Sequence, residues 1–140
     1  MKVLVDTSVW SLALRRRAPA HAAVDELRRL VAQGRAGIVG PVRQELLSGI
    51  RERAAFERLR DHLRAFPDEP ITSVDYERAA DCLNLCRAKG IQGSNTDFLL
   101  CAVAERTKFA ILTTDNDFVK FRRVLPLRLH AFGQEPAPAD

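Results

Sequence analysis

Short apolar runs alternate with longer amphipathic stretches along this chain of 140 residues. Short runs rich in branched residues are typical of buried strands, whereas apolar positions that recur every three or four residues indicate helices. The pattern predicts four strands, at residues 2–5, 36–39, 109–113 and 127–132. Because strands that alternate with helices form βαβ units, we expect a central parallel β-sheet flanked by α-helices, the α/β class.

The predicted helices begin or end at recognisable signals. Gly34 and Gly90 follow helical patterns as C-terminal caps, Pro41 occupies a first turn, and Pro67 ends a helix. The helices are expected from Ser8 onward and at residues 21–33, 41–50, 51–66, 74–89, 95–106 and 115–121. No repeat or linker divides the chain, so we expect one domain over residues 1–132 and a flexible tail at residues 133–140.

The composition, 46% hydrophobic and 29% charged, is that of an ordinary globular protein. The longest apolar run, residues 98–104, is much shorter than the ~20 residues of a membrane span. Asp6 interrupts the N-terminus before the core of a signal peptide could form. The three cysteines are too few for a disulfide scaffold, so we expect a reducing, cytoplasmic setting and no membrane partner.

Five acidic residues fall at or near the carboxyl ends of the predicted strands. Asp6 directly follows the first strand, Asp115 follows the third, and Asp117 lies two residues further on. Asp97 opens the helix that leads into the third strand, and Glu45 lies on the helix after the second. Because open parallel sheets bind ligands beyond the carboxyl ends of their strands, we expect these acids at one edge.

Each acid also has a purely structural explanation. Ser94–Asp97 and Thr114–Asp117 both match the capping box, in which an acidic side chain only stabilises the start of a helix. Asp6 is equally placed to cap the helix that follows it. Glu45 could be a solvated helix residue beside Arg43.

Helical spacing favours a shared site over separate caps. Asp97 lies on the same helix face as Leu100, Cys101 and Ala104, which we expect to face the core. Carboxylates that are partly buried at one edge repel one another, and each desolvated charge is costly unless it is paired. No Lys is close to them in sequence, so a divalent cation is the plausible compensation. A site made only of carboxylate oxygens suits Mg²⁺, with Mn²⁺ as a possible substitute, and argues against zinc.

Four motifs, in this order, resemble those of the PIN-domain ribonucleases, and in particular the VapC-type toxins of bacterial type II toxin–antitoxin systems. They are Asp6-Thr7-Ser8-Val9-Trp10, Glu45-Leu46-Leu47, Asp97 at the head of an apolar helix, and Thr113-Thr114-Asp115-Asn116-Asp117-Phe118. The likeness extends from about residue 2 to residue 132. It implies a single PIN-like α/β domain.

The same resemblance implies a Mg²⁺-dependent endoribonuclease that hydrolyses phosphodiester bonds in RNA. It assigns the catalytic acids Asp6, Glu45, Asp97 and Asp115, the metal ligands Asp6, Asp97, Asp115 and Asp117, and the supporting hydroxyls Thr7, Ser8 and Thr113. It also implies a homodimer and a small DNA-binding, VapB-like antitoxin whose tail enters the acidic groove.

Basic residues outnumber acidic ones and give a net charge of +4, and 18 of the 22 are Arg. Arg forms bidentate contacts with phosphate, which indicates a nucleic-acid or acidic partner, although a GC-rich genome would also enrich Arg. Arg15, Arg16 and Arg17 are candidate RNA contacts. Their alternative role is a solvated run that neutralises a helix C-terminus, and the same two readings apply to Arg122 and Arg123.

Other chemistries find little support in the residues. Cys82 and Cys86 share a helix face without a third ligand, so core packing explains them, and no His lies near a Ser or Cys nucleophile motif. Two rival functions stay open. A small Mg²⁺-dependent phosphotransfer domain also places Asp at strand ends, but Asp6 has no acidic neighbour at position 7 or 8. A PIN-like module could instead bind RNA or protein without cleaving it.

Overall fold

Three short parallel strands lie at the centre of the computed structural model, which describes residues 1–15, 17 and 20–133. They are β1 (Val3–Val5), β2 (Ala36–Gly37) and β3 (Ala110–Leu112), in the order β2-β1-β3. Val3 pairs with Ala36 on one side and with Ala110 on the other. All three residues of β1 are buried, as expected for a parallel strand covered on both faces. The predicted α/β class with a parallel central sheet is confirmed.

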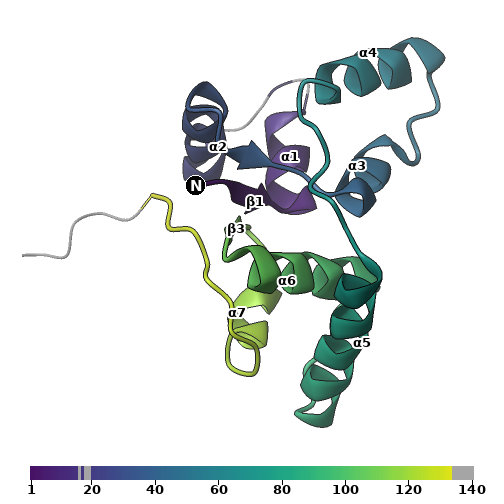
Figure 1. Cartoon of the computed structure of the whole chain (residues 1–140). Helices are drawn as coiled ribbons and strands as arrows, with labels where there is room; N and C mark the ends of the chain where they lie inside the picture. The colour runs from purple at the N-terminus through teal and green to yellow at the C-terminus, as the bar shows by residue number, and fades with distance from the viewer. Residues whose placement is uncertain (16, 18–19, 134–140) are drawn as a thin grey trace, which may run out of the picture.

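Helices cover both faces of this sheet (Figure 1). One layer contains α1 (Thr7–Ala13), α2 (Ala22–Ala32), α3 (Gly40–Leu47) and α4 (Arg53–Leu63). The opposite layer contains α5 (Ser73–Ala88), α6 (Asn95–Thr107) and α7 (Asp117–Phe121). Within the described residues, no helix is both long and apolar enough to cross a membrane.

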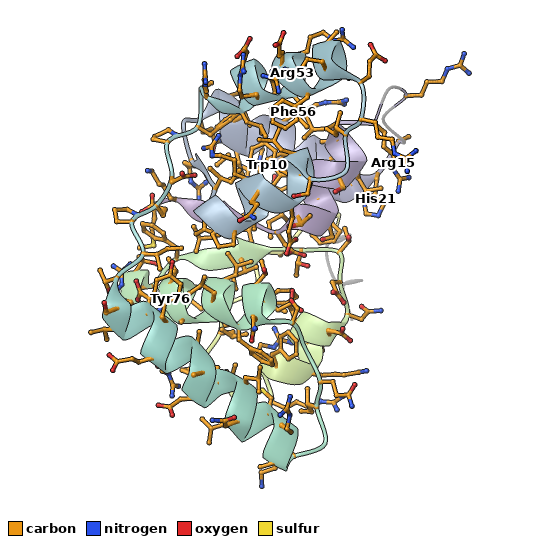
Figure 2. All side chains as sticks on the ribbon, turned by 90° about the vertical axis from the view of Figure 1, so that its right-hand side faces the viewer. Trp10, Arg15, His21, Arg53, Phe56 and Tyr76 are labelled. Atoms are coloured by element: carbon orange, nitrogen blue, oxygen red, sulfur yellow. The ribbon has the colours of Figure 1, made fainter. Side chains whose placement is uncertain are left out.

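The first layer has an aromatic interior. Trp10 is only 2% exposed, and its ring meets the Phe66 ring edge-to-face, with a centroid distance of 5.1 Å. Figure 2 shows Trp10, Arg53 and Phe56 together in this layer, whereas Tyr76 lies in the opposite layer on α5. The Arg53 guanidinium lies over the Phe56 ring, 5.0 Å from its centroid. Trp10 is therefore a core residue of this layer.

The prediction of a fourth strand at residues 127–132 is wrong. This segment forms a single parallel bridge between Leu129 and Ile111. The Ile111 amide donates to the carbonyl oxygen of Arg128 at 2.9 Å, and the His130 amide donates to that of Ile111 at 2.8 Å. β3 ends at Leu112, so within the described part of the chain the residues of this segment beyond the bridge have no strand beside them with which to form a regular ladder.

Two predicted helices are shorter than expected. The helix predicted to reach Ile50 ends at Leu47, and Gly49 then adopts a φ of 86°, which favours glycine. The helix predicted at residues 51–66 is α4, which ends at Leu63. In the predicted tail at 133–140, every residue after Gly133 lies outside the described part of the chain.

Candidate active site at the carboxyl edge of the sheet

Asp6 directly follows β1 and is the central side chain of this edge, with only 6% of the residue exposed. Its Oδ2 atom accepts hydrogen bonds from Ser8 Oγ and Thr113 Oγ1, each at 2.8 Å. Asp6 occupies the N-cap position of α1, but its side chain makes no capping hydrogen bond. The capping explanation for Asp6 is therefore wrong, and its carboxylate is oriented by the two hydroxyls instead.

The two hydroxyls also hold the loop that follows β3. Ser8 Oγ accepts from the Thr114 amide at 3.1 Å, and Thr113 Oγ1 accepts from the Asp115 amide at 3.0 Å. Each hydroxyl has one proton, and both protons are donated to Asp6. The network thus fixes the Asp6 carboxylate and the loop carrying Asp115 as one unit.

The Asp6 carboxylate has little positive charge to balance it. Burial raises its pKa, and the hydrogen bonds from Ser8 and Thr113 oppose that shift without cancelling it. Across residues 1–15, 17 and 20–133, no Lys or Arg forms an ion pair with Asp6. A nearly buried carboxylate in this state favours a cation that the described residues do not provide.

Asp97 lies in the first turn of α6, where the predicted capping box is confirmed. Its amide donates to Ser94 Oγ and its Oδ2 accepts from the Ser94 amide, both at 3.1 Å. The pKa of Asp97 is raised, first by burial and further by the negative charges of Asp6 and Asp115. Asp97 therefore stabilises a helix start and also lies within electrostatic range of the other two acids.

Gly93 sets the approach of the chain to α6. A Cβ atom at this position would lie 2.5 Å from Phe121 Cζ and 2.9 Å from Phe98 Cζ, far inside van der Waals contact. The rings of Phe98 and Phe121 themselves pack with a centroid distance of 4.8 Å. Only glycine fits there, so the aromatic contact between α6 and α7 fixes where Asp97 enters the site.

The capping box predicted at Thr114–Asp117 is not formed, so that prediction is wrong. Instead, the Asp117 amide donates to Asp115 Oδ1 at 2.9 Å, so Asp115 supports the start of α7. Asp117 is half-exposed, and its carboxylate lies 3.7 Å from Lys120 Nζ, so the expectation that no Lys is close to these acids is wrong at Asp117. Of the two, Asp115 is the one joined to the Asp6 network through its own amide.

Glu45 is exposed on α3 and is held to the edge by Thr7, whose Oγ1 donates to Glu45 Oε2 at 2.8 Å.

Arg43 does not pair with Glu45. That guanidinium donates to Asp68 Oδ1 at 2.9 Å and to the carbonyl oxygens of Leu63 and Phe66, so it anchors α3 to the loop after α4. Sequence reasoning missed this anchoring role, because Arg43 and its three acceptors are separated by 20 or more positions.

These contacts bring the predicted acids and hydroxyls to one edge, but they leave the acids spread apart. Among the described residues, no three His, Cys, Asp or Glu side chains form a group that could hold a metal ion. Mg²⁺ does not require such a cage, because proteins bind it through one or two carboxylates, with water and substrate phosphates completing the shell. The oxygen-only donors around Asp6 therefore fit Mg²⁺ and do not fit a closed structural metal site.

The remaining candidates lie outside this network. Arg15 and Arg17 are exposed, and Arg16 lies outside the described residues. The thiols of Cys82, Cys86 and Cys101 are buried, and burial raises the pKa of each, which agrees with packing between α5 and α6. His130 bonds Glu26, with 2.5 Å between Nε2 and Oε2.

Comparison with known proteins identifies the same architecture. The family model of the PIN domain matches residues 3–124. No curated protein matches the chain. The solved structure of VapBC2 from Rickettsia felis, bound to a promoter DNA fragment, has a chain with a TM-score of 0.73 and 17% identity, covering 93% of this chain and 98% of its own.

Two further structures are similar at the level of the fold. A chain of FitAcB from Neisseria gonorrhoeae gives a TM-score of 0.72 at 16% identity and covers 92% of this chain and 96% of its own. A chain of a toxin–antitoxin complex from Klebsiella pneumoniae gives a TM-score of 0.61 at 16% identity and covers 84% of this chain and 90% of its own.

Proposed function

The chain belongs to the PIN-domain family, and from that premise we propose that it is a Mg²⁺-dependent endoribonuclease, the toxin of a type II toxin–antitoxin pair. PIN domains are generally nucleases. The observation that carries the proposal is the nearly buried Asp6 carboxylate, whose pKa is raised by burial. Its negative charge and that of Asp115 both act on the Asp97 carboxylate. A phosphodiester would add negative charge to this edge, which is favourable only with a cation between them.

Because Mg²⁺ needs only one or two carboxylates, we assign Asp6 and Asp97 as its principal ligands, with Asp115 and the accessory Asp117 binding it through water. A bound Mg²⁺, or Mn²⁺ in its place, would supply Lewis-acid stabilisation of the phosphodiester and a water of lowered pKa. Ser8 and Thr113 orient the Asp6 carboxylate through their hydrogen bonds.

Glu45 is the acid that we assign to accept a proton from the attacking water. Its carboxylate is exposed to solvent, and Thr7 holds Oε2, which leaves the side chain positioned but accessible. A general base removes the proton of the attacking water through a hydrogen bond, and an exposed carboxylate at the rim of the site is open to water for that step.

Substrate and partner contacts extend the proposal. Arg15 and Arg17 are exposed beyond the C-terminal end of α1, about 10 Å of helix from Asp6, where they could contact phosphates that flank the cut. Arg16, between them, belongs to the same proposed run. The similar chains from toxin–antitoxin complexes support a small DNA-binding, VapB-like antitoxin as partner. We further propose a homodimer that acts in the cytoplasm.

A cleavage assay on total RNA tests the proposal. Protein freed of any partner should cleave RNA with Mg²⁺ and lose that activity in EDTA. Asp97→Asn should keep the fold by circular dichroism, because an amide oxygen can still accept from Ser94, but should lose cleavage. Asp25→Asn is the matched control, since this acid is exposed on α2 outside the site.

Two outcomes would contradict the assignment. If folded Asp97→Asn cleaved as fast as the wild type, Asp97 would not belong to the site. If RNA bound the wild type and survived long incubation with Mg²⁺ or Mn²⁺, the chain would be a binding module without nuclease activity.

A further inference from the structure

A pocket of about 340 Å³ adjoins the acidic edge on the side of α7. Thr113 and Asp115 line it, and both belong to the network around Asp6. We call it the α7 pocket. Its volume lies within the range of pockets that bind small organic groups. The pocket is therefore large enough for a flat heterocycle and lies directly beside the proposed point of cleavage.

The walls of the α7 pocket are mixed in character. Val119, Leu129 and Phe132 supply apolar surface, whereas Asn116 and Arg122 supply polar groups. Arg122 is exposed and forms no ion pair with any residue in the described ranges. An Arg that is not committed to a protein carboxylate keeps its planar set of donors for a ligand.

The outer wall is fixed in place by contacts to two different elements. The segment after α7 forms hydrogen bonds with both the amide and the carbonyl of Ile111 in β3. His130 then binds Glu26 of α2, and Arg29 donates to the same carboxylate at 2.5 and 2.8 Å. In Figure 1 this segment runs from α7 past the sheet toward α2. The pocket is thus formed by anchored backbone.

The described lining of the pocket has no excess of positive charge that would favour a phosphate. Asp115 and Arg122 carry opposite charges in its lining, whereas a nucleobase is neutral and accepts hydrogen bonds from an Arg. Proteins recognise single-stranded RNA by placing unstacked bases against apolar or aromatic groups and by hydrogen-bonding their edges. The fork of donors on Arg matches the O6 and N7 acceptors of guanine.

We propose that the α7 pocket receives a base next to the scissile phosphate and selects guanine through Arg122. This inference rests on the proposed ribonuclease function and adds a substrate preference to it. Arg122 is then a specificity-determining residue that contacts the base, and Val119 and Phe132 form the apolar surface against which the base packs.

The test uses RNA oligonucleotides that differ only in the bases flanking a mapped cleavage site. For the wild type, kcat/KM should be highest with guanine at one flanking position. Arg122→Ala should lower kcat/KM for that RNA by roughly tenfold or more. It should change kcat/KM much less for the RNAs that carry adenine, cytosine or uracil at that position. Arg123→Ala is the matched control, because Arg123 is an exposed neighbour outside the pocket and its loss should leave the preference unchanged.

A second variant tests the pocket by volume. Val119 is 41% exposed on α7, so Val119→Phe should fold and partly fill the pocket. It should lower the preference for guanine while Arg122 is retained. The proposal would be overturned if the wild type cleaved all four RNAs with equal kcat/KM. It would also be overturned if Arg122→Ala lowered kcat/KM for all four by the same factor, since a uniform loss is typical of a phosphate contact.

The inference can fail separately from the proposed function. RNA cleavage with no effect of Arg122→Ala on base preference overturns the inference alone. If the wild type cleaves no RNA, the nuclease proposal fails, and fluorescence anisotropy of the same oligonucleotides then decides the pocket. Tighter binding of the guanine RNA that is lost in Arg122→Ala supports a base pocket, and equal binding of all four overturns it.

Discussion

Thr113 Oγ1 donates a 2.8 Å hydrogen bond to Asp6 Oδ2 across 107 positions of the chain. This bond joins the ends of β3 and β1, the two strands that lead into the site. Because Asp6 is nearly buried without an ion-pair partner in the described residues, the hydroxyl is one of the few groups that stabilise its charge.

Thr113→Val should therefore impair cleavage without unfolding the protein. Valine keeps the shape of threonine but neither donates to Asp6 nor accepts from the Asp115 amide. Loss of a hydrogen bond to a charged group costs about 1.5–3 kcal/mol, so we expect kcat/KM to fall about ten- to hundredfold. Thr107→Val is the control, because that hydroxyl bonds the Val103 carbonyl within α6. An unchanged rate would mean that Thr113 does not orient Asp6.

Mg²⁺ should stabilise the folded protein in the absence of RNA. Burial raises the pKa of Asp97, and the negative charges of Asp6 and Asp115 raise it further; a bound cation offsets both effects. At ten times its Kd, a ligand that binds only the folded state should raise Tm by about 5 °C. Differential scanning fluorimetry with and without EDTA measures this shift. Asp97→Asn should reduce it and Asp25→Asn should not; equal shifts in both variants would place the ion elsewhere.

Arg106→Ala should destabilise the α5–α6 layer strongly. Asp75 is 2% exposed and accepts from Arg106 Nε at 2.7 Å. Removing the guanidinium leaves a buried carboxylate without its cation, which costs about 3 kcal/mol. Arg78→Ala removes the pair with Glu105 between the same two helices. The Glu105 carboxylate is 28% exposed, against 2% for Asp75, so this loss should cost about 1 kcal/mol or less. Urea denaturation of both variants checks the difference, and similar losses would contradict it.

Glu26→Gln should destabilise the protein at neutral pH but not in strong acid. Hydrogen bonding from Arg29, assisted by His130, lowers the pKa of Glu26 to about 2, against an ordinary value of 4.5. A carboxylate with a lowered pKa contributes stability above its unfolded pKa and loses it as pH falls through the folded pKa. The wild type should thus be more stable by about 1–3 kcal/mol at pH 7, and the difference should shrink between about pH 4.5 and 2.

Thermal unfolding of the wild type and Glu26→Gln as a function of pH measures that difference. Asp25→Asn serves as control, because Asp25 is exposed on the same helix and its pair with Arg28 is long, at 3.7 Å. A difference between wild type and Glu26→Gln that stayed constant down to pH 2 would contradict the linkage.

The local pattern of the sequence predicted the elements well, because periodicity and caps are local properties. The strand at residues 2–5 and the capping box at Ser94–Asp97 are both present. The strand expected at residues 127–132 failed because pairing depends on a distant partner, and β3 offers only Ile111.

The candidate site shows the same division. That acids follow strands β1 and β3 could be deduced from the sequence, since the ends of parallel strands meet at one edge. The bonds that orient those acids could not: Thr7 reaches Glu45 across 38 positions, and Ser8 accepts from the Thr114 amide across 106. In place of the Thr114–Asp117 box, Asp115 accepts from the Asp117 amide, while Ser8 holds the Thr114 amide.

The position of β3 late in the chain also has a consequence for biosynthesis. A ribosome that has released only the first hundred or so residues has already exposed Asp6, Glu45 and Asp97, but β1 then lacks its β3 neighbour and Asp6 lacks the Thr113 hydroxyl. Such a nascent chain lacks Asp115 and one of the two hydroxyls that orient Asp6. We expect such a chain to be inactive toward the message being translated, and activity to begin only after the segment around Thr113 has emerged and paired.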